Sequence, residues 1–143
     1  MNDYLKPDIG ATILRVTLGI VLIAHSLYLK LFVFTLPGTA AFFASIGLPE
    51  LLAYIVFTIE AVAGIALILG FKTRWFAALL IPVLLGATWA HAGSGWLFSN
   101  PNGGWEYPLF LTMAAIVQIF LGDGRYAIKS TREELQTEKA KYA

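Results

Sequence analysis

The stretch LLAYIVFTIEAVAGIALILGF, residues 51–71, is apolar throughout except for a single charged side chain, Glu60. A helix needs about 20 mostly apolar residues to cross the hydrocarbon core of a bilayer, which is about 30 Å thick. Residues 51–71 therefore predict a membrane-spanning helix with Glu60 near its middle. A charged side chain at a helix centre costs about 2.5–3.5 kcal/mol on insertion scales, so Glu60 is a candidate functional residue.

Outward from this stretch, three more segments have the composition of membrane spans, at about residues 9–29, 75–92 and 107–126. Over the whole chain 58% of residues are hydrophobic, only 13% are charged, and the mean hydropathy is +0.72. So few charges could not cover the apolar surface of a water-soluble domain of this size. The expected fold is all-α, an integral membrane four-helix bundle that forms a single domain over residues 1–128.

Lysine and arginine are distributed unevenly between the two sides of this predicted bundle. One side holds both termini and the loop between spans two and three, and it carries eight Lys or Arg residues against Lys30 alone on the other. Because positive residues concentrate on the cytoplasmic side, both termini are expected in the cytoplasm. Residues 129–143 form a charged cytoplasmic tail, in which the capping-box spacing of Ser130 and Glu133 predicts a short surface helix.

Two connections on the side opposite the termini differ in character. PGTAAFFASIGLP, residues 37–49, is apolar but interrupted, and it predicts a short helix in the interface or between spans. GSGWLFSNPNGGWE, residues 93–106, is rich in Gly, Asn and Trp, and it predicts a loop with tight turns at a membrane–water boundary. The apolar run of the first span exceeds the roughly 7–15 residues of a signal peptide, so we expect this span to be retained.

Composition also excludes several chemistries. The chain has no cysteine, which removes disulfides, iron–sulfur clusters and cysteine zinc sites, and its two histidines are too few for a two-haem cytochrome b. It contains no nucleotide-binding loop, and a net charge of +1 gives no reason to expect nucleic acid. We therefore expect no intrinsic cofactor.

Arg15 in the first span is the natural partner for Glu60 in the second. Antiparallel neighbouring helices would place Arg15 somewhat to the cytoplasmic side of Glu60, within reach of two long side chains. We predict an ion pair between them. A structural pair and a substrate or proton site both fit this arrangement, and the two interpretations are compatible.

A second set of polar residues lies at the outer ends of the spans: His25, His91 and Glu106. A histidine titrates near pH 6.5, so this set could carry protons to or from a reduced carrier, with Trp89 and Trp105 as an aromatic wall. Two alternatives remain open. One is a 2-His-carboxylate metal site, which no paired ligand spacing on one helix supports; the other is hydrogen bonding of each group to a loop carbonyl.

Six features in chain order resemble the DoxX family. They are an arginine in span one, FASIGLP (43–49), EAVAGIALILGFKTR (60–74), His91, GGWEYP (103–108) and GDGRY (122–126). The resemblance covers about residues 14–128 and implies a small four-helix membrane protein of bacteria or archaea. It also implies an association with membrane redox chemistry, because the founding relatives belong to thiosulfate:quinone oxidoreductases and others join oxidative-stress complexes. The family-like polar positions in this chain are Arg15, Glu60, His91 and Glu106.

The leading hypothesis is an inner-membrane subunit of a quinone-linked or oxidative-stress oxidoreductase complex. His91 and Glu106 would hydrogen-bond the quinone ring as proton acceptors, Glu60 would be a further catalytic group, and Arg15, His25, Trp89 and Trp105 would bind substrate. Electrons would come from a partner redox subunit or a bound substrate, and a homo-oligomer is the other expected assembly. Two other classes stay open: a non-catalytic scaffold that docks cytoplasmic partners through its tail, and a small-solute transporter.

Overall fold

The computed structural model describes residues 5–128 and 140–141, so the predicted tail helix lies outside the described residues apart from two positions. Within residues 5–128 every regular element is helical, which confirms the all-α class. The elements are α1 (Leu5–Ile23), η1 (Ala24–Val33), α2 (Leu36–Ser45), α3 (Glu50–Leu69), α4 (Thr73–Ala90), η2 (Ala92–Ser94) and α5 (Glu106–Leu121).

Three helical segments are long and apolar enough to cross a bilayer: Pro7–Val33, which runs through α1 and η1, then α3 and α4. α5 is also apolar but has only 16 residues, about 24 Å at about 1.5 Å per residue. It ends at Leu121 rather than near Tyr126 because Gly122 has a left-handed φ of 78°. The Gln118 side chain then donates a 2.6 Å hydrogen bond to the Gly122 carbonyl oxygen.

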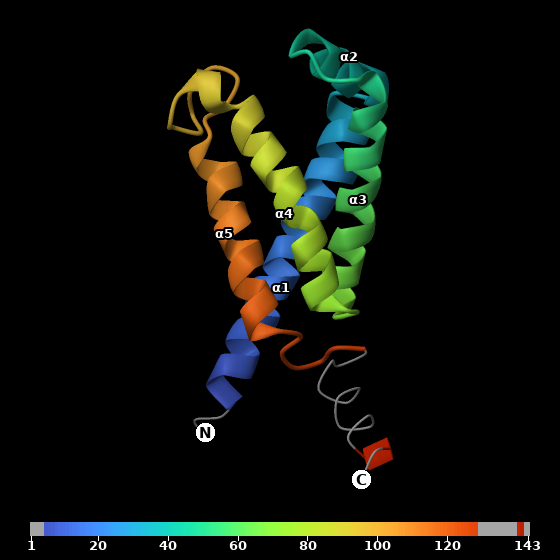
Figure 1. Ribbon diagram of the computed structural model, residues 1–143, viewed down its shortest axis with the longest axis vertical. Helices are drawn as coiled ribbons and strands as arrows, with labels where there is room; N and C mark the ends of the chain where they lie inside the picture. The colour runs from blue at the N-terminus through green and yellow to red at the C-terminus, as the bar shows by residue number, and fades with distance from the viewer. Residues whose placement is uncertain (1–4, 129–139, 142–143) are drawn as a thin grey trace.

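The helices are arranged as two pairs, α1 with α3 and α4 with α5 (Figure 1). The pairs diverge toward one end of the bundle, where α2 and the loop 91–105 lie. We call this the α2 end, and the opposite end, with residues 70–72 and 122–128, the Gly70 end. The short helix expected within residues 37–49 is confirmed as α2, which packs against α3 and η1.

The first membrane segment changes its winding partway along. η1 is a π-helix of 10 residues that continues directly from α1, and its last bond joins Phe34 N to Leu29 O at 2.8 Å, five residues back. π-helical segments are rare, and where they occur they are frequently at functional sites. Here the wider winding alters which side chains of residues 24–33 face α3.

Gly19 of α1 and Gly64 of α3 set the closest approach between these two helices. A Cβ atom on Gly19 would lie 2.7 Å from the Gly64 carbonyl oxygen, and one on Gly64 would lie 3.1 Å from the Gly19 carbonyl oxygen. Small residues at helix contacts permit this approach, which in lipid supplies van der Waals packing where a hydrophobic driving force is missing. The buried core continues from this contact through Leu18, Leu22, Ala63, Leu67, Leu80, Leu84, Leu111 and Ala115.

A methyl group at Gly19 should therefore push α1 away from α3. We expect Gly19→Ala to lower the free energy of unfolding by about 1–3 kcal/mol, the usual cost of overpacking. The measurement is helix loss with temperature or denaturant in detergent, followed by circular dichroism. Gly86→Ala is the matched control, because nothing lies within 4 Å of a Cβ there and alanine favours a helix by up to about 1 kcal/mol. Equal stability of the two variants would show that the helices do not meet at Gly19.

Candidate functional site

Arg15 lies at the Gly70 end, and there it is 1% exposed. Its Nη1 donates to the carbonyl oxygens of Leu67 at 2.7 Å and Ile68 at 2.9 Å, and its Nη2 donates to that of Arg125 at 3.1 Å. Carbonyls in the last turn of a helix lack intrahelical donors, and a cation there also complements the helix dipole. Arg15 therefore joins α1 to the end of α3 and to the segment after α5.

Asp123 balances this buried cation. It is 6% exposed, it interacts electrostatically with Arg15, and its Oδ1 accepts a 3.2 Å hydrogen bond from the backbone N–H of Thr73 at the start of α4. A buried charge needs a partner of opposite sign or several hydrogen bonds, and the Gly70 end provides both. This polar cluster joins the middle of α1 to the end of α3, the start of α4 and the segment after α5, and it lies at the opposite end of α5 from Glu106.

Glu60 forms an ion pair with Lys30 of η1, so the predicted pairing of Arg15 with Glu60 is wrong. The error is one of register. Gly19 lies opposite Gly64, so Arg15, one turn before Gly19, is level with Ile68 rather than with Glu60. The side chains of Lys30 and Glu60 are only 17% and 8% exposed, so the ion pair is largely buried. It lies beside the middle of α3.

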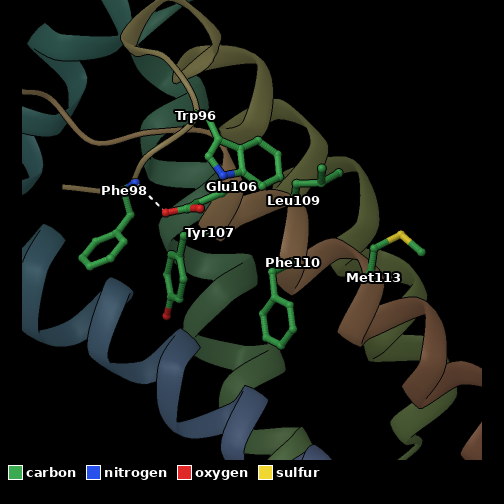
Figure 2. A pocket seen from close by; sticks show the side chains of 7 residues that line it. All are labelled: Trp96, Phe98, Glu106, Tyr107, Leu109, Phe110 and Met113. Carbon is green, nitrogen blue, oxygen red and sulfur yellow. Dashed lines mark hydrogen bonds between the residues drawn. The ribbon is translucent and has the colours of Figure 1, made fainter. Parts of the chain in front are cut away.

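A groove runs along the first turns of α5 at the α2 end, with a volume of about 460 Å³ (Figure 2). The α5 residues that line it follow one helical face, and the loop before α5 closes one side. The groove is open along the helix, since Phe110 and Met113 are 68% and 53% exposed. The lining residues are Trp96, Phe98, Glu106, Tyr107, Leu109, Phe110 and Met113.

Glu106 is the charged residue of this groove. Its Oε1 accepts a 2.8 Å hydrogen bond from the backbone N–H of Phe98, drawn as the dashed line in Figure 2. It stands in the first turn of α5, where the helix dipole favours a negative charge. Oε2 makes no hydrogen bond to any described residue, so this oxygen can accept one from a bound molecule.

Both histidines use Nδ1 in hydrogen bonds to backbone carbonyls. His25 Nδ1 lies 2.8 Å from Val21 O, and His91 Nδ1 lies 2.9 Å from Asn102 O. Because a carbonyl only accepts, Nδ1 must carry the proton, which leaves Nε2 of the neutral ring as an acceptor. His25 also stacks on Tyr107, with ring centroids 5.8 Å apart, and so adjoins the groove. His91 borders the loop but does not line the groove.

The two predicted tryptophans are placed differently. Trp105 packs edge-on against Trp96 with ring centroids 4.5 Å apart, so it supports the groove from behind, whereas Trp89 is 58% exposed on α4 and lies outside it.

The sequence did not predict Tyr107, Phe110 and Met113 as part of a site, although the spacing of 106, 110 and 113 marks one helical face. In the described part of the chain, no three His, Asp or Glu side chains gather closely enough to hold a metal ion.

The Lys30–Glu60 pair yields a test by double-mutant cycle. Glu60→Gln should leave a buried ammonium without its partner and lower stability by about 3–5 kcal/mol, whereas Lys30→Met with Glu60→Met should recover most of that loss. Thermal unfolding in detergent at pH 7 measures both. The same cycle between Arg15 and Glu60 is the control and should give a coupling close to zero. The assignment fails if Glu60 couples to Arg15 and not to Lys30.

Comparison with known proteins identifies the family. The profile of the DoxX family matches residues 10–93, which is more than half of the chain and includes Arg15, Glu60 and His91 but not the groove. A protein of Bacillus subtilis (strain 168) named "Putative oxidoreductase CatD" is 38% identical over 80 residues, which cover 56% of this chain and 58% of that protein. The chain thus spans less than two thirds of the length of that relative. No solved structure matches this chain. On the extent of the profile match, this protein belongs to the DoxX family.

Proposed function

We propose that this protein is a membrane subunit of a quinone-linked oxidoreductase complex, and that the groove beside α5 binds the quinone head group. The observation that supports this most directly is a single carboxylate, Glu106, set among aromatic side chains in an open groove. Sites for small molecules are typically apolar with a few placed polar groups. The name of the Bacillus relative agrees with the reaction class.

The residues present fit a quinone. A volume of about 460 Å³ is within the usual range for small-molecule sites, and the rings of Trp96, Phe98 and Phe110 offer surfaces for a flat ring. Glu106 Oε2 supplies an acceptor and the Trp96 indole N–H a donor, and the Tyr107 hydroxyl, which points away from Glu106 (Figure 2), can be either. A bound quinone would supply the capacity to carry electrons together with protons.

Glu106 is the proton-binding group of this chain that we place nearest to the quinone. Its Oε2 is the available acceptor in the groove, and Tyr107 beside it can donate or accept. His25 stacks on Tyr107 with Nε2 free to accept a proton, and His91 offers the same atom on the other side of the loop. We assign the two histidines and Glu106 the path by which protons would reach the groove from the water at the α2 end, as electrons from the partner subunit or the substrate reduce the quinone.

The proposed setting is a bacterial or archaeal inner membrane, crossed four times with both termini in the cytoplasm. α5 would be the fourth span, and the exposed residues Lys72, Arg74 and Arg125 at the Gly70 end would then face the cytoplasm, in keeping with the positive-inside rule. Because the chain has no cysteine and only two histidines, electrons would enter from a partner subunit or a bound substrate.

Phe110 and Phe120 provide a matched test of the groove. Both are exposed phenylalanines on α5, 68% and 78% respectively, but only Phe110 lines the groove. We expect Phe110→Ala to weaken binding of a short-chain quinone about tenfold, as loss of a packed aromatic ring predicts, and Phe120→Ala to leave it unchanged. The measurement is photolabelling by an azido-quinone in lipid nanodiscs, with competition by the unlabelled compound and mapping of labelled peptides.

Label that maps to residues 106–113 and is lost in Phe110→Ala would support the site. Equal labelling of both variants, or label spread along the lipid-facing length of α5, would show that the quinone only partitions into the bilayer. The proposed function would then lose its site, while the fold and the family assignment would stand.

A further inference from the structure

Three consecutive apolar side chains project from the loop before α5. Trp96, Leu97 and Phe98 are 51%, 52% and 69% exposed, and we call them the 96–98 edge. The residues that follow, 99–102, are Ser, Asn, Pro and Asn, so the loop has an apolar edge and a polar tip. We infer that the 96–98 edge is inserted into the acyl region of the bilayer and extends the short helix α5. This inference goes beyond the proposed function and does not require a quinone.

The loop is held in a fixed shape by backbone hydrogen bonds between residues 95–96 and residues 105–106. Trp105 N donates to Gly95 O and Glu106 N donates to Trp96 O, each at 3.1 Å. A Cβ atom on Gly104 would lie only 2.2 Å from Leu97 O, so the chain crosses itself at van der Waals contact there. The backbone of the edge is therefore fixed, and Trp96 and Phe98 stay about half exposed or more at the mouth of the groove that they line.

Part of the backbone of the edge is hydrogen-bonded within the protein. The carbonyls of Gly95, Trp96 and Leu97 all accept internal hydrogen bonds, and the N–H of Phe98 donates to Glu106 Oε1. Each internal bond of this kind lowers the cost of bringing irregular chain toward the acyl chains, where no water can replace it. Glu106 thus has a positioning role through Oε1 that is separate from the acceptor at Oε2.

Helix length supplies the reason for insertion. α3 has 20 residues, about 30 Å, but α5 has 16, about 24 Å, against a hydrocarbon core of about 30 Å. Phe110 and Met113 on the exposed face of α5 line the same groove as Trp96 and Phe98 of the edge (Figure 2), and Phe120, 78% exposed, lies further along α5. Lipid that covers that face would also cover the edge beside it. The polar tip then reaches the head groups.

Tryptophan fluorescence can measure this depth directly. The reporter is Trp96 alone, with Trp75, Trp89 and Trp105 changed to Phe, in vesicles of phosphatidylcholine with or without chain-brominated lipid. The matched control is Pro101→Trp at the polar tip, in a background where all four tryptophans are Phe. We expect brominated chains to quench Trp96 at least about twice as strongly as the tip reporter, and aqueous iodide to do the reverse. Circular dichroism verifies that both variants are folded.

Two outcomes would overturn the inference. Trp96 that iodide quenches as strongly as the tip reporter would place the edge in water. Trp96 that neither quencher reaches would mean that protein covers it, either a second copy or another subunit. Both outcomes are independent of quinone photolabelling, so a failure here is distinguishable from a failure of the proposed site.

Glu106 variants separate its two roles. Glu106→Gln keeps an oxygen that can accept the Phe98 N–H, so quenching of Trp96 by brominated lipid should stay within about a third of the unsubstituted value. Glu106→Ala removes that acceptor and should bring Trp96 quenching close to that of the tip reporter. If Glu106→Ala leaves the quenching unchanged, Glu106 does not position the edge.

Discussion

The buried guanidinium of Arg15 meets three carbonyl oxygens from two distant stretches of chain, and the register of the bundle depends on it. Arg15 is 1% exposed, so water cannot satisfy the carbonyls that it meets at the end of α3, and the donor has to come from the protein. Arg15 supplies it and at the same time holds the segment after α5 against α1. With Gly19 against Gly64 one turn away, α1 has a single way to lie along α3.

This register determines the partner of Glu60. Once Arg15 is level with Ile68, it is committed to the end of α3, and a carboxylate in the middle of that helix needs another cation. Lys30 fills this role from η1, where π-helical winding turns residues 24–33 relative to an α-helical continuation. The pair is too buried to be an incidental surface contact, and removing either charge alone would leave the other without compensation.

Local patterns were sufficient to predict that the apolar segments are helices, but not where each ends: the first continues to Val33 and α5 ends at Leu121. They also identified α2 and the loop before α5. They did not predict that Arg15 and Glu60 would bind different partners, since register depends on contacts between distant glycines and on a π-helix with no simple sequence signature. The groove was missed for a similar reason. Its wall comes from a loop whose shape depends on backbone bonds between residues 95–98 and 103–106.

The polar side chains at the two ends of the bundle differ in burial and in how many of their hydrogen-bonding atoms are available to a ligand. At the Gly70 end, Arg15, Asp123 and Gln118 are buried and bonded largely to backbone, and the atoms there that lack a hydrogen-bond partner, such as Arg15 Nε and Gln118 Oε1, are buried too. At the α2 end the helix pairs diverge, and Glu106 has one oxygen committed to Phe98 and one available. A carboxylate fixed by one oxygen is already oriented when a ligand meets the other, so less conformational freedom is lost on binding. The hydrogen bond that shapes the loop would thus also prepare the acceptor in the groove.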